Sequence, residues 1–164
     1  RGLLRESEAI LRSIGDLPIV PEQRDFGPWN LLVTPSGELA VLDWESARMD
    51  GLPGLDLLYF LAYASFNVEG AHDRDSRLAA YRRSLDPSTR TGGVRRECLA
   101  RYARATGHPV EQFEPLGVLL WMLHAPSEYH HAAADAGGAP ESSRLRRSLF
   151  LALWGEEVRR LSGG

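Results

Sequence analysis

Apolar residues follow two different periods along this chain, and each period predicts its own kind of element. Near the start, Leu4, Leu11 and Ile14 fall on one face of a helix whose other positions include charged residues, so an amphipathic helix is expected there. Residues 15–18 end with a proline, which cannot continue a helix. The chain is therefore predicted to open with a helix followed by a loop.

The clearest strand signal is a pair of apolar runs, 31–33 and 38–42, separated by a turn that contains proline and glycine. This arrangement is typical of a β-hairpin. If the turn is centred on 36–37, counting along two antiparallel strands sets Asn30 opposite Asp43. Opposed residues lie about 4.5–5.5 Å apart at Cα, so an amide and a carboxylate are expected together at one end of the hairpin.

The remainder of the chain is predicted to be helical. Residues 55–66 are apolar nearly all round, which indicates a buried helix. By the same periodicity, further helices are expected at 72–85, 94–106, 110–130 and 141–161. Two prolines should kink or shorten the helix at 110–130, and the small residues of 132–138 predict a loop. The expected fold class is α+β, mainly α, with one domain over residues 1–164.

Composition argues against several partners. Charged residues make up 25% of the chain and the net charge is -3, a balance that favours neither a disordered acidic segment nor a nucleic-acid-binding surface. Cys98 is the only cysteine, which leaves no internal disulfide and fits a reducing cytoplasm. No apolar run reaches the roughly 18 residues that a membrane span needs. A cytoplasmic protein that binds neither nucleic acid nor membrane is expected.

Three oxygen-bearing side chains are expected to converge where the hairpin begins. Asp25 lies in the loop that leads to Asn30, and Asp43 follows the second apolar run. Oxygen ligands suit Mg²⁺, which usually binds through one or two protein groups together with substrate phosphates. A phosphoryl-transfer site also needs a carboxylate that orients the attacking hydroxyl and accepts its proton. This pattern favours Asp25 as the proton acceptor and Asn30 with Asp43 as metal ligands.

The segments QRDFGPWN at 23–30 and LDW at 42–44 resemble the H-G-D-x-x-x-x-N and I-D-W motifs of aminoglycoside phosphotransferases, choline kinases and their relatives. Residues 51–57 are similar to the G-D-P-x-x-D-L stretch of that family. The resemblance implies a protein-kinase-like C-terminal lobe, with a catalytic β-hairpin and several packed helices. It also implies phosphoryl transfer from ATP, with Mg²⁺, to a hydroxyl of a small molecule.

Carried over residue by residue, the resemblance matches Asp25 to the catalytic base. It matches Asn30 and Asp43 to the metal ligands. The residues implied to support the catalytic loop are Gln23, Arg24 and Asp56. An alternative for Asp25 and Asn30 is a purely local role, because Asp and Asn often satisfy backbone groups in turns.

The sequence departs from the family pattern at several points. Gln23 stands where the family usually has histidine, Arg24 replaces the usual glycine, and Leu52 replaces the first aspartate of the third motif. The phosphate-gripping lysine and the nucleotide loop of the family lie in an N-terminal lobe, whereas this sequence contains no lysine. The chain is therefore interpreted as the C-terminal lobe alone, and weak ATP binding is expected for it.

A late helical stretch could form an aromatic and acidic wall for a cationic acceptor. The candidate substrate-binding residues in it are Trp121 and Glu128, although core packing is the alternative for a tryptophan. Packing is also expected for Trp29 and Trp44. A zinc site at 130–131 is disfavoured, because adjacent residues on a helix point about 100° apart.

Two other functions stay open. Gln23 and the missing N-terminal lobe motivate a catalytically degenerate, kinase-like binding or regulatory domain, and a structural interaction domain is the second alternative. The acceptor is also open among aminoglycosides, choline-like amines, sugars and amino-alcohols, and the donor between ATP and GTP.

Overall fold

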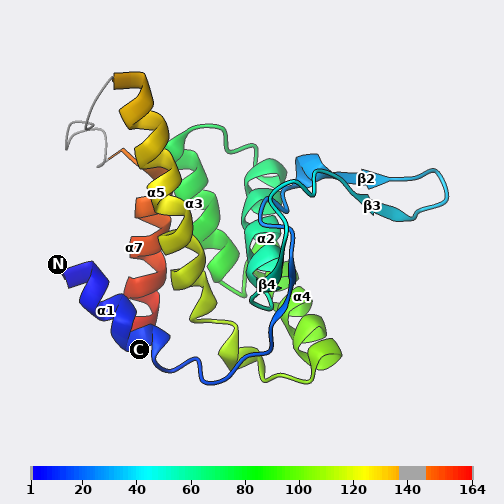
Figure 1. Cartoon of the computed structure of the whole chain (residues 1–164), viewed down its shortest axis with the longest axis horizontal. Helices are drawn as coiled ribbons and strands as arrows, with labels where there is room; N and C mark the ends of the chain where they lie inside the picture. The colour runs from blue at the N-terminus through cyan, green and yellow to red at the C-terminus, as the bar shows by residue number, and fades with distance from the viewer. Residues whose placement is uncertain (1, 137–146, 164) are drawn as a thin grey trace.

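The computed structural model describes residues 2–136 and 147–163, which form an array of helices with two short β-ribbons at one side (Figure 1). The helices are α1 (Gly2–Leu11), α2 (Leu55–Val68), α3 (Arg74–Leu85), α4 (Arg90–Thr106), α5 (Leu116–Ala136) and α7 (Leu149–Ser162). The strands are β1 (Val20–Glu22), β2 (Leu31–Val33), β3 (Leu39–Val41) and β4 (Arg48–Gly51). Two 3-10 turns, η1 (Pro28–Asn30) and η2 (Val110–Gln112), precede β2 and α5. The expected class, α+β and mainly α, is confirmed.

The hydrophobic core lies among α2, α3, α5 and α7. Helix α5 packs against α7, α1 and α2, and α3 packs against α2, α4 and α7. Phe66, Trp121 and Leu153 are at most 1% exposed. The buried helix predicted at 55–66 is confirmed, and its buried residues are Leu55, Leu58, Tyr59, Leu61, Ala62, Ser65 and Phe66. Within the described residues, no helix is both long enough and apolar enough to cross a membrane.

Strands β2 and β3 form an antiparallel hairpin, but their register differs by one residue from the expected one. Leu31 pairs with Val41, and the Leu42 amide donates to the Asn30 carbonyl (2.8 Å). The pairing of Asn30 with Asp43 was therefore wrong, because Leu42 takes that place. Figure 1 shows the hairpin extending away from the helices.

The turn of the hairpin explains the shift in register. The Thr34 amide donates to the Glu38 carbonyl (2.9 Å), and the Gly37 amide donates to the Thr34 carbonyl (2.9 Å). Gly37 adopts a left-handed conformation with φ of 85°. Three residues, 35–37, thus form the loop, which is the common alternative to a two-residue turn when glycine occupies the left-handed position.

The later helices differ from the expected boundaries where prolines occur. The predicted helix 110–130 is divided, because η2 ends at Gln112 and α5 begins at Leu116, directly after Pro115. Pro126 lies inside α5. The loop expected at 132–138 is wrong for 132–136, which are helical, and 137–138 lie outside the described residues. Residues 141–146 of the last predicted helix also lie outside them, and α7 begins at Leu149.

A second ribbon, β1 with β4, was not predicted. Val20 pairs with Gly51, and Glu22 pairs with Arg48. These strands lack the apolar alternation that marks a strand in sequence. Their pairing brings the segment before residue 23 beside the segment before α2, and this positions the candidate site.

Candidate functional site

The loop that carries Asp25 is held at its start by Asp56, from the first turn of α2. The Asp56 carboxylate accepts hydrogen bonds from the backbone amides of Gln23 (2.7 Å) and Arg24 (2.9 Å). Arg24 has φ of 74°, a left-handed conformation that side chains rarely adopt. Burial raises the pKa of the neighbouring Glu22, and the Asp56 carboxylate adds to this shift. Asp56 therefore stabilises an unusual turn directly before Asp25.

Gln23 connects this loop to the end of the hairpin. Its side chain is buried, and its Oε1 accepts a hydrogen bond from the Asp25 amide (2.9 Å). Its Nε2 donates to the carbonyls of Leu42 (3.1 Å) and Asp43 (2.5 Å). The Gln23 amide thus pairs with one backbone N–H through its oxygen and with two backbone carbonyls through its NH2 group.

Asp25 and Asn30 are in direct contact. The Asn30 Nδ2 donates to the Asp25 carbonyl (2.9 Å) and to its Oδ2 (3.0 Å), and Asn30 is 7% exposed. The Trp29 indole also donates to Asp25 Oδ2 (3.2 Å), and the Tyr59 hydroxyl lies 3.5 Å from Oδ1. The structure thus gathers donors around the Asp25 carboxylate from both η1 and α2.

Asp43 is connected to the loop of Asp25 through its backbone, because its carbonyl accepts a hydrogen bond from Gln23. Its φ is 55°, and its side chain is exposed. Among the described residues, its carboxylate has no hydrogen-bond partner. No group of three or more His, Cys, Asp or Glu side chains arranged for a metal ion occurs in the described part of the chain. Asn30 and Asp43 together would offer one amide oxygen and one carboxylate. Two protein ligands would suit Mg²⁺, which takes most of its ligands from phosphates and water.

Aromatic residues that the sequence analysis did not assign to the site lie beside Asp25. Trp29 contacts Tyr63 edge-on (4.8 Å between ring centroids), and Tyr59 lies 4.7 Å from Tyr63 and stacks on His124 (4.8 Å). Burial raises the pKa of Tyr59 and lowers that of His124. The sequence did carry a signal for these residues: Tyr59 and Tyr63 follow Asp56 at spacings of three and four residues, which places all three on one face of α2.

The tryptophans do not lie as the sequence suggested. Trp29 is 50% exposed and Trp44 is 56% exposed, so neither lies in the core, although Trp29 packs edge-on against Tyr63. Trp121 is fully buried and donates from its indole to the Tyr81 hydroxyl (2.8 Å). This placement favours the packing interpretation of Trp121. The side chain of Glu128 lies outside the described residues, as do those at 130–131.

A model of the phosphotransferase enzyme family matches residues 8–98. The matched segment covers more than half of the chain and includes the loop, the hairpin and α2. The chain therefore belongs to the phosphotransferase enzyme family, whose members generally use ATP and Mg²⁺. Searches of curated proteins and of solved structures found no significant match.

Proposed function

We propose that this chain carries the catalytic loop of a kinase that transfers a phosphoryl group from ATP to a hydroxyl of a small molecule. The observation that supports it is the contact between Asp25 and Asn30, in a loop that Gln23 ties to the backbone of Asp43. Family membership supports the reaction class.

Asp25 is the proposed general base. The acceptor hydroxyl attacks the γ-phosphorus, the bond from phosphorus to the bridging oxygen of ADP breaks, and the hydroxyl proton passes to the Asp25 carboxylate. The donors from Trp29 and Asn30 orient this carboxylate. Asp56 and Gln23 have positioning roles, because they act on the loop backbone and not on the reacting atoms.

Asn30 and Asp43 would hold Mg²⁺. The Asn30 amide nitrogen faces Asp25, which leaves its oxygen as the available ligand, and the Asp43 carboxylate is exposed and has no hydrogen-bond partner among the described residues. When bound, the ion would neutralise charge on the phosphates.

The proposed partners are a hydroxyl acceptor and an N-terminal nucleotide-binding lobe of the same protein. The acceptor would lie at the aromatic group of Trp29, Tyr59 and Tyr63, since these rings adjoin the proposed base. The lysine that the family uses to grip the phosphates has no counterpart in this chain. Nucleotide affinity of the chain alone is therefore expected to be low.

Substitutions of the two carboxylates test the proposal in the intact protein. Asp25→Asn should lower kcat by about 10²–10⁴-fold, the usual contribution of a positioned base, with nucleotide affinity nearly unchanged. Asp43→Asn should instead raise the Mg²⁺ concentration needed for half-maximal rate. The measurement is acceptor-dependent ADP release over a panel of amino-alcohols, sugars and aminoglycosides.

The control is Asp50→Asn, an exposed carboxylate on β4 that pairs with Arg48, and it should behave like the parent protein. An Asp25→Asn variant with the turnover of the parent would remove Asp25 from the role of base. If the parent protein phosphorylates nothing on the panel, a binding or regulatory domain becomes the better function. The departure from the family motif at Gln23 is the observation that favours that second candidate.

A further inference from the structure

A pocket with a volume of about 320 Å³ lies between α2, the end of α3, α4 and the segment that leads into α5. This size falls at the lower end of the range for small-molecule sites, roughly 300–1,000 Å³. Its apolar wall consists of Leu58, Leu85, Leu99, Val110 and Phe113. As far as the chain is described, the lining contains none of the residues that hold Asp25.

Arg95 is the unusual member of the lining. It is 8% exposed, and its side chain is 10% exposed, yet its buried Nη1 has no hydrogen-bond partner among the described residues. Its cation also lies 5.9 Å from the ring of Tyr81. A guanidinium carries five N–H donors, and buried polar groups almost always have partners. The structure thus contains a buried cation whose donors are not satisfied.

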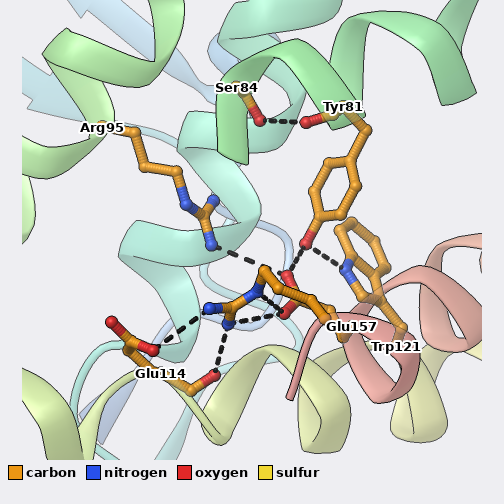
Figure 2. Close-up of polar contacts among 7 residues, drawn as sticks. Tyr81, Ser84, Arg95, Glu114, Trp121 and Glu157 are labelled. Atoms are coloured by element: carbon orange, nitrogen blue, oxygen red, sulfur yellow. Dashed lines mark hydrogen bonds and ion pairs between the residues drawn. The ribbon is translucent and has the colours of Figure 1, made fainter. Parts of the chain in front are cut away.

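The nearby acid, Glu157, does not satisfy it. Figure 2 shows Arg95 facing Glu157, and a second arginine, Arg160, forms an ion pair with the same carboxylate. Glu157 accepts hydrogen bonds from Arg160 (2.9 Å) and from the Tyr81 hydroxyl, whereas Arg95 Nη2 remains 3.8 Å from its Oε1. Arg160 also pairs with Glu114 (3.1 Å). The carboxylates of Glu157 and Glu114 therefore bind Arg160 and Tyr81, and Arg95 is left without a hydrogen-bonded carboxylate among the described residues.

We propose that this pocket binds a small organic carboxylate, with the carboxylate at the Arg95 guanidinium and an apolar body against the wall of the pocket. The charges support a monoanion: Arg95, Arg96 and Arg160 line the pocket with Glu114, and Glu157 lies behind them. Three cations and two carboxylates leave an excess of one positive charge. Guanidinium groups match the planar carboxylate with two parallel hydrogen bonds.

The chemistry of the wall disfavours other ligands. A phosphate dianion would exceed the available positive charge, and it has no apolar part to occupy the side of the pocket formed by leucine and phenylalanine. A neutral apolar molecule would leave Arg95 without a partner. A carboxylic acid with a ring or short chain satisfies both parts of the pocket.

The test uses benzoate as the probe, with benzyl alcohol as its neutral analogue of similar size. Isothermal titration calorimetry on the purified chain, at fixed ionic strength, should give saturable binding of one benzoate. Benzyl alcohol and Arg95→Gln should each weaken binding by about tenfold or more, as expected when a charge-assisted pair is lost. Benzoate should also raise the Tm of the parent chain.

Matched variants on α4 locate the site. Leu99→Phe fills the pocket and should abolish benzoate binding, while Val94→Phe places the same ring on the exposed side of α4, where Val94 is 54% exposed, and should bind as the parent does. Val110→Phe fills the pocket from another wall if Leu99→Phe does not fold.

Four results would overturn the proposal. Benzoate binding that survives in a folded, pocket-filled variant would place the site elsewhere. Equal binding of benzyl alcohol would remove the role of the carboxylate. If inorganic phosphate displaces benzoate and binds more tightly, the ligand is not a carboxylate. No binding by the parent chain would mean that water alone satisfies Arg95.

Discussion

Gln23 suits its position because the backbone around it presents both donors and acceptors. It meets the amide of Asp25 and the carbonyls of Leu42 and Asp43. A neutral histidine, the usual residue of the family at this point, has one donor and one acceptor nitrogen, so it would satisfy the Asp25 amide and only one of the two carbonyls. The departure from the family pattern therefore preserves the support of the loop, and this argues against loss of the site at Gln23.

The first prediction at this scale is that Gln23→Met destabilises the chain although it keeps a similar side-chain volume. Buried backbone groups lose their partners, and such losses cost about 1–3 kcal/mol. Urea unfolding should show a decrease of about 2–3 kcal/mol in the free energy of unfolding. Gln112→Met is the comparison: it removes a single side-chain contact, with His108 (3.2 Å), and should cost about 1 kcal/mol or less. Equal effects of the two substitutions would mean that the Gln23 hydrogen bonds do not stabilise the loop.

At the scale of elements, the contact between α5 and α2 joins the core to the candidate site. His124 of α5 stacks on Tyr59 of α2, and Tyr59 points its hydroxyl toward Asp25. Phe150 of α7 lies 5.5 Å from the His124 ring. A change in the charge of His124 would therefore act on both the helix packing and the neighbourhood of Asp25.

We predict that this contact makes stability depend on pH. Burial lowers the pKa of His124 below 6.5, and the Arg24 charge adds to this shift while Asp25 opposes it. Between the folded pKa and 6.5 the unfolded chain binds more protons, so the free energy of unfolding should fall as the pH decreases through this window. His124→Phe keeps an aromatic ring and should reduce the loss of Tm between pH 7.5 and pH 5. An unchanged pH profile in His124→Phe would assign the dependence to other groups.

At the scale of the whole molecule, short-range patterns were predictable and long-range ones were not. Asp25 and Asn30 are five residues apart in one loop, so the sequence motif already implied their contact. The place of Asp43 depended on the hairpin register, which one additional loop residue changed. The cluster around Glu157 escaped prediction entirely, because Tyr81 lies 76 residues before it and periodicity gives no information on which helices meet.

Glu157 also gives the last prediction, because it joins several helices at one buried point. It is fully buried on α7, accepts from Tyr81 of α3 and Arg160 of α7, and faces Arg95 of α4.

Glu157→Gln would remove the buried carboxylate that accepts from Arg160 and Tyr81 and that lies 3.8 Å from Arg95. Breaking a buried pair in this way costs about 3–5 kcal/mol, and the free energy of unfolding measured in urea should fall by that amount. Glu156→Gln changes the adjacent residue, whose side chain is 12% exposed but whose partners Arg82 and Arg159 are 55% and 67% exposed. Because both pairs reach solvent, it should cost about 1 kcal/mol or less. If Glu156→Gln costs as much as Glu157→Gln, the buried cluster does not stabilise the helix packing more than a surface pair does.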